Sequence, residues 1–112
     1  MNSTKINYIE LTASDLSLVK DFYSKAFGWT FTDYGSNYVA FSNAGIEGGF
    51  EKSDAPTNSN ILVVLYHENL EEVYSTVQKC GGKIVQEIFS FPGGRRFQFT
   101  DPCGNELAIW SE

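Results

Sequence analysis

The two halves of this 112-residue chain repeat one pattern of apolar and glycine positions at a constant step. Each half has a strand-like run, then two apolar residues at helical spacing, then a glycine. These are 8–11, Leu16, Val19 and Gly28 in the first half, and 62–65, Leu70, Val73 and Gly82 in the second. Half a chain is too long for a solenoid repeat. The pattern predicts two copies of one structural unit, and the boundary between such units is a common place for a ligand.

Apolar periodicity, capping residues and turn residues predict the same order of elements in both halves: strand, helix and three strands. The expected elements are strand 6–12, helix 16–27 and strands 29–34, 38–42 and 46–51, then strand 61–66, helix 70–80 and strands 83–90, 95–100 and 106–110. The polar segment 53–60 has almost nothing to bury and is expected to link the two halves. We therefore expect an α+β fold in one domain, with module one over about 5–52 and module two over about 61–112.

The charge of the chain limits its partners. A formal net charge of −6 argues against nucleic acid and against anionic membrane surfaces. It favours a cationic ligand, although acidity serves solubility in many proteins. The chain has no apolar run of about 20 residues, its first residues lack the features of a signal peptide, and its two cysteines have no metal-like spacing. These features predict a cytoplasmic protein.

Segments near both ends resemble the vicinal oxygen chelate superfamily, which includes glyoxalases, bleomycin-resistance proteins, fosfomycin-resistance enzymes and extradiol dioxygenases. The matching segments are Tyr-Ile-Glu-Leu-Thr-Ala-Ser-Asp-Leu at 8–16, Asp-Phe-Tyr at 21–23, Phe-Gly-Trp at 27–29 and Phe-Thr-Asp-Pro-Cys-Gly-Asn-Glu-Leu at 99–107. The resemblance implies two βαβββ modules whose sheets form an open cup, with the helices on the outside. It says little about function, because this fold supports many chemistries.

The resemblance also locates the positions at which family enzymes hold a divalent metal ion. These positions fall on Tyr8, Leu62 and Ala108. Leucine and alanine have no lone pair to donate, and a neutral tyrosine is a poor ligand. We therefore expect no metal, no cofactor and no catalytic residue, and the only histidine, His67, follows the strand and does not restore the site.

Strand alternation predicts which side chains face the cup and line a ligand site. The expected ligand-binding residues are Tyr8, Glu10, Trp29, Tyr38, Phe50, Leu62, Tyr66, Arg96, Gln98 and Trp110. Aromatic rings in such a site bind flat or cationic compounds, whereas packing in the core is the alternative role for each ring. A buried Glu10 would need a partner, which Arg96 or a cationic ligand could supply.

Together these features indicate a metal-independent protein that sequesters or carries a small organic ligand of cationic or aromatic character. Bleomycin-resistance proteins are the family members that it resembles in this respect, and by analogy with them we expect a homodimer. One alternative is a lyase, isomerase or dioxygenase whose metal is held by substitutes among Glu10, Glu47, Glu51, Gln98 and Glu106. Another is a module whose aromatic residues dock a protein partner.

Overall fold

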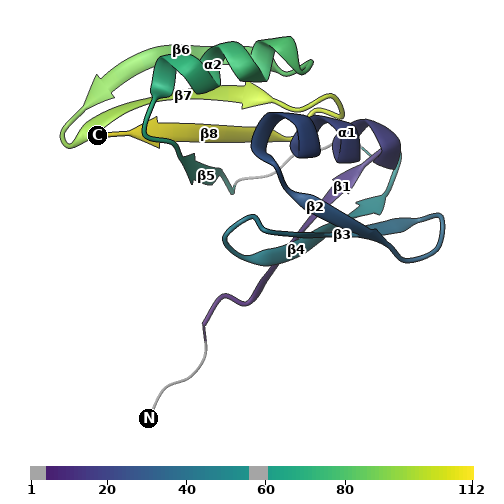
Figure 1. Ribbon diagram of the computed structural model, residues 1–112. Helices are drawn as coiled ribbons and strands as arrows, with labels where there is room; N and C mark the ends of the chain where they lie inside the picture. The colour runs from purple at the N-terminus through teal and green to yellow at the C-terminus, as the bar shows by residue number, and fades with distance from the viewer. Residues whose placement is uncertain (1–4, 56–60) are drawn as a thin grey trace. The chain divides into compact units, whose positions relative to one another are not determined.

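The computed structural model describes residues 5–55 and 61–112 (Figure 1). The chain divides into two compact units, Met1–Ala55 and Pro56–Glu112, which we call unit 1 and unit 2. This division falls within the predicted linker 53–60, of which residues 56–60 lie outside the described residues.

Both units have the predicted βαβββ order. Unit 1 contains β1 (Tyr8–Ala13), α1 (Leu16–Phe27), β2 (Thr30–Asp33), β3 (Tyr38–Ser42) and β4 (Glu47–Lys52). Unit 2 contains β5 (Val63–Tyr66), α2 (Leu70–Lys79), β6 (Lys83–Phe91), β7 (Gly94–Thr100) and β8 (Glu106–Ser111). The predicted strand ends are wrong by one or two residues in several places, and Trp29 and Leu62 lie just outside the strands in which they were expected.

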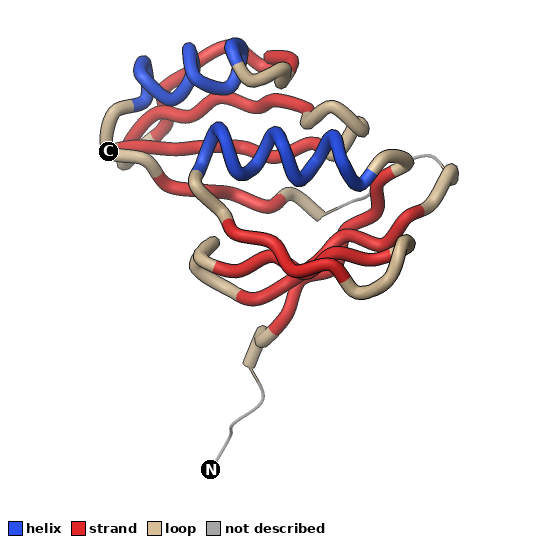
Figure 2. Tube along the Cα trace, turned by 45° about the vertical axis from the view of Figure 1, so that its right-hand side comes forward, coloured by secondary structure: helices blue, strands red, loops and turns tan. Residues whose placement is uncertain are grey.

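Each unit forms a four-stranded mixed sheet, which confirms the α+β class (Figure 2). The strand orders are β1-β4-β3-β2 and β5-β8-β7-β6, with the first two strands of each order parallel and the other neighbours antiparallel. Glu10 lies opposite Gly49 in unit 1, and Val64 lies opposite Ala108 in unit 2. These two pairs occupy the same place in the two sheets, so the repeat in the sequence is also a repeat in strand register.

Side-chain caps fix where the two helices begin. Asp15 accepts hydrogen bonds from the backbone N–H groups of Ser17 and Leu18 at 3.0 and 3.3 Å, and Asn69 accepts one from Glu72 at 3.1 Å. These bonds satisfy amides that have no partner within the helix. Gly28 ends α1 with a φ of 76°, a left-handed conformation that glycine adopts without steric cost.

The core of unit 1 lies between its sheet and the buried residues Val19, Phe22 and Tyr23 of α1. Trp29 stacks on Tyr23 with ring centres 4.6 Å apart, and the ring of Phe50 lies 5.4 Å from that of Tyr23. Trp29 is 7% exposed and Phe50 is completely buried. This placement corrects the expectation that these two rings line a ligand site, because both are on the side of the sheet that α1 covers.

The core of unit 2 lies between its sheet and α2. Leu70, Val73 and Val77 of α2 are buried on the side of the sheet that carries the following buried residues: Phe97, Phe99, Leu107 and Ile109. Figure 1 shows α2 lying along this sheet. Within the described part of the chain, neither helix has the length and hydropathy needed to cross a membrane.

Candidate functional site

Each sheet has one face against its own helix and one face that this helix does not cover, which we call the helix-free face. Directly paired residues share a face, and alternate residues along a strand share it too. The helix-free face of unit 1 is formed by Tyr8, Glu10, Thr12, Tyr38, Ala40, Glu47, Gly49 and Glu51. The helix-free face of unit 2 is formed by Val64, Tyr66, Phe89, Phe91, Arg96, Gln98, Glu106, Ala108 and Trp110.

Three predicted site residues meet on the helix-free face of unit 1. The hydroxyl oxygens of Tyr8 and Tyr38 are 2.5 Å apart, and the Tyr38 hydroxyl donates to Glu10 Oε1 at 3.1 Å. A tyrosine hydroxyl has one proton to donate. Since Tyr38 gives its proton to Glu10, Tyr8 donates to Tyr38, and the three side chains form a directed chain from Tyr8 through Tyr38 to Glu10.

This chain keeps Tyr38 protonated. Burial raises the pKa of the Tyr38 hydroxyl above its ordinary value, and the hydrogen bond that Tyr38 donates to Glu10, with the charge of that carboxylate, raises it further. Loss of the proton would place a second negative charge beside the Glu10 carboxylate. Tyr38 therefore acts at neutral pH as a hydrogen-bond donor and not as a base.

Gly49 makes room for the Tyr38 ring. A Cβ at this position would collide with the Tyr38 hydroxyl and ring carbon and would lie 2.7 Å from the carbonyl oxygen of Val39. The pairing of β4 with both neighbours shows no shift of register at this point. Gly49 thus permits close approach of a side chain and does not mark a β-bulge.

The residues at the three positions that the resemblance implies for metal ligands do not fit a divalent ion. The Tyr8 hydroxyl is held in its bond to Tyr38, Leu62 is apolar, and the Ala108 methyl group is completely buried. Zinc and related ions need several nitrogen, sulfur or carboxylate ligands. In residues 5–55 and 61–112, no three or more His, Cys, Asp or Glu side chains are grouped as metal ligands would be.

Aromatic side chains form a continuous row on the helix-free face of unit 2. The Trp110 ring centre lies 5.1 Å from that of Tyr66 and 6.5 Å from that of Phe91, and Phe91 lies 6.4 Å from Phe89. The guanidinium carbon of Arg96 lies 5.3 Å from the centre of the Phe89 ring. Such spacing is typical of favourable aromatic and cation–π contacts. Tyr66, Arg96 and Trp110 were predicted to share a face, and their strand register places them on one.

Two carboxylates near this row are already hydrogen-bonded. Gln98 Nε2 donates to Glu106 Oε2 at 2.6 Å, and the Tyr66 hydroxyl donates to Glu112 Oε1 at 2.5 Å. The bond to Glu112 raises the pKa of Tyr66 above its ordinary value. Gln98 and Tyr66 thus orient side chains of their own unit.

Phe89 and Phe91 belong to this face but were missed in the sequence. The pairing of β6 with β7 shifts register between Ile84 and Gln86, and again between Gln86 and Phe89. Each shift breaks the simple alternation from which inward and outward residues are inferred. One feature of the sequence could have identified them. Phe89 and Phe91 are two residues apart in a strand and lie after the second register shift, so they share a face.

Comparisons with known proteins agree with this architecture. A family model described as Glyoxalase/Bleomycin resistance protein/Dioxygenase superfamily matches residues 5–109. The crystal structure of a glyoxalase-related enzyme from Fulvimarina pelagi superposes with a TM-score of 0.83 at 16% identity, covering 98% of this chain and 89% of that one. At this identity the likeness concerns the fold alone.

Two relatives match nearly the whole chain in sequence. The anthracycline biosynthesis protein DnrV of Streptomyces peucetius is 27% identical over 124 residues, covering 92% of this chain and 45% of DnrV. The candidate glyoxylase CFP32 of Mycobacterium tuberculosis (strain CDC 1551 / Oshkosh) is 28% identical over 120 residues, covering 93% of this chain and 44% of CFP32. The chain thus spans less than half the length of either relative.

Proposed function

Because this chain belongs to the glyoxalase/bleomycin resistance protein/dioxygenase superfamily, we propose that it binds a small organic molecule without a divalent metal ion. The observation that carries the proposal is the chemistry at the family's metal positions. A hydrogen-bonded phenol, an apolar side chain and a buried methyl group stand at Tyr8, Leu62 and Ala108. The protein then sequesters or carries its ligand.

The helix-free faces supply side chains suited to an organic ligand. Unit 1 offers phenol and carboxylate groups, and unit 2 offers a row of rings with one guanidinium group. The relative DnrV is described as an anthracycline biosynthesis protein, which is consistent with an organic ligand. A flat ring system is the kind of ligand that stacks on exposed aromatic side chains.

Thermal unfolding with a ligand panel tests this proposal. The protein is kept in excess chelator and heated with flat cationic, neutral and anionic compounds. A compound at a hundred times its Kd stabilises the folded state by about 2.7 kcal/mol, which gives a clear rise in Tm for a chain of this size. We expect such a rise with at least one class. If no compound stabilises the protein in chelator and stabilisation appears only after a metal ion is added, the proposal is wrong.

A further inference from the structure

Arg96 has no ionic partner among the described residues. It takes part in none of the ion pairs formed there, and its Nε atom is buried without a hydrogen-bond partner. A buried guanidinium N–H that makes no bond loses the hydration it had in water. Most such groups in folded proteins do have a partner, so an unbonded one calls for an explanation.

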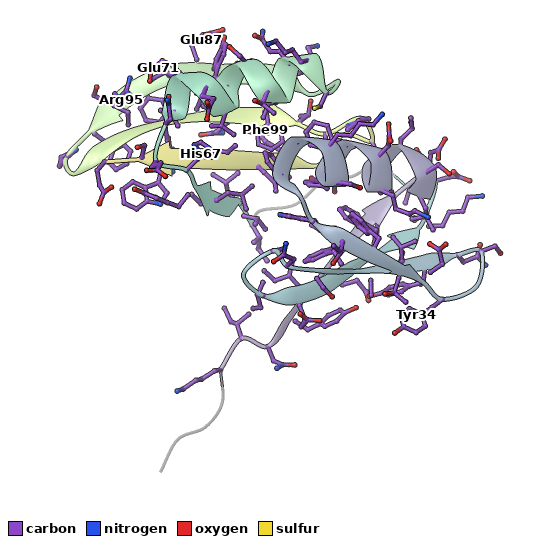
Figure 3. All side chains as sticks on the ribbon, viewed as in Figure 1. Tyr34, His67, Glu71, Glu87, Arg95 and Phe99 are labelled. Atoms are coloured by element: carbon purple, nitrogen blue, oxygen red, sulfur yellow. The ribbon has the colours of Figure 1, made fainter. Side chains whose placement is uncertain are left out.

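The neighbouring residue Arg95, unlike Arg96, has a guanidinium group that is hydrogen-bonded to a carboxylate. Arg95 donates to both carboxylate oxygens of Glu71, with N···O distances of 2.6 and 3.2 Å (Figure 3). This pairing raises the pKa of Arg95 and lowers that of Glu71. Since successive residues of a strand face opposite sides, Arg95 lies on the side of α2 and Arg96 on the helix-free face.

Two carboxylates of this unit, one on β8 and one at its end, are bonded to other side chains. Glu106 is bonded to Gln98, and Glu112 is bonded to Tyr66. Two aromatic side chains lie next to Arg96. Phe89 lies under its guanidinium, and Trp110, which contacts Phe91, is its direct partner across β7 and β8.

We infer that the helix-free face of unit 2 binds a flat aromatic carboxylate. The ligand's carboxylate pairs with Arg96, and its ring packs against Trp110 and Phe91. Arginine is suited to this role because its planar N–H groups match the two oxygens of a carboxylate. The inference rests on the proposed small-molecule function and makes it more specific, because net acidity alone favours a cationic ligand.

The test uses 2-naphthoate as the probe and the full ¹⁵N-labelled chain. Proton–nitrogen NMR spectra follow the Arg96 Nε–H and Trp110 indole N–H signals during titration with 2-naphthoate, with neutral 2-naphthamide and with cationic 2-naphthylmethylamine. We expect naphthoate to shift both signals in a saturable way and to bind about tenfold or more tightly than the other two. A charged hydrogen-bonded pair accounts for a difference of that size.

Two variants separate the role of Arg96 from a general effect of charge. Arg96→Gln is expected to weaken naphthoate binding by about tenfold or more while leaving naphthamide binding unchanged. Arg95→Gln removes the same charge from the other face, so naphthoate binding should be unchanged. Dispersed amide signals in each variant's spectrum verify that it is folded.

Three outcomes would overturn the inference. If the three probes bind equally and Arg96→Gln has no effect, the carboxylate of naphthoate plays no part in binding. If Arg96→Gln and Arg95→Gln lose the same affinity for naphthoate, the effect comes from net charge and not from Arg96 itself. No shift with any probe would mean that this face of unit 2 does not bind a flat aromatic compound. In each case the small-molecule function still stands if the ligand panel stabilises the protein, and it fails as well only if the panel also gives nothing.

Discussion

Replacing Phe50 with alanine is expected to lower the free energy of unfolding by about 3–5 kcal/mol, the usual cost of removing a buried phenylalanine ring. The Phe50 side chain is completely buried, and its ring lies within 5.4 Å of Tyr23 and 5.8 Å of Phe41, measured between ring centres. The cost combines lost transfer energy with the cavity left among rings that cannot fully close it. A domain has only about 5–15 kcal/mol of stability in total, so the variant should be close to unfolding.

Urea unfolding followed by circular dichroism measures this loss. Tyr34→Ala is the matched control, because Tyr34 is an aromatic residue of the same unit that is 63% exposed. We expect this control to change stability by no more than about 0.5 kcal/mol. A loss below about 1 kcal/mol for Phe50→Ala would contradict the core position and would return Phe50 to a face open to ligand.

Replacing Asp101 with alanine is expected to cost about 3 kcal/mol, because three hydrogen bonds lose a charged acceptor at once. Asp101 is 3% exposed. Its Oδ1 accepts from the backbone N–H groups of Cys103 at 2.9 Å and Asn105 at 3.0 Å, and its Oδ2 accepts from Asn105 Nδ2 at 3.0 Å. This carboxylate shapes the turn that leads into β8.

Asp101→Asn is the control for this change. Asparagine keeps one oxygen for the two backbone N–H groups and loses the charge and the bond to the Asn105 amide, so we expect a smaller loss of stability than with alanine. Unfolding by urea ranks the two variants. Equal stability of Asp101→Ala and the natural protein would show that the turn forms without the carboxylate.

Local patterns in the sequence were enough to predict the order of elements in both units. Alternation along β7 and β8 placed Arg96, Gln98 and Trp110 on one face, because a single strand determines which of its residues share a side. The first residue of each helix was likewise predictable, since capping needs only a few neighbouring residues.

Features that depend on strand order or on irregular pairing could not be predicted in this way. The chain from Tyr8 through Tyr38 to Glu10 exists because β4 lies between β1 and β3 and carries Gly49 beneath the Tyr38 ring. The burial of Phe50 could be inferred only once the register of β4 with β1 and β3 was known. The shifts within β6 hid the side on which Phe89 lies.

We expect ligand binding by this chain to need no divalent metal ion. Thermal unfolding of chelator-treated protein, with and without Ni, Zn, Mn, Fe(II) and Mg ions, tests it most directly. We expect the same Tm in every sample, because Leu62 and Ala108 can donate no electron pair and Tyr8 is bonded to Tyr38. A saturable rise in Tm with one ion, equivalent to about 2.7 kcal/mol at a hundred times its Kd, would contradict it and favour a metal-dependent enzyme.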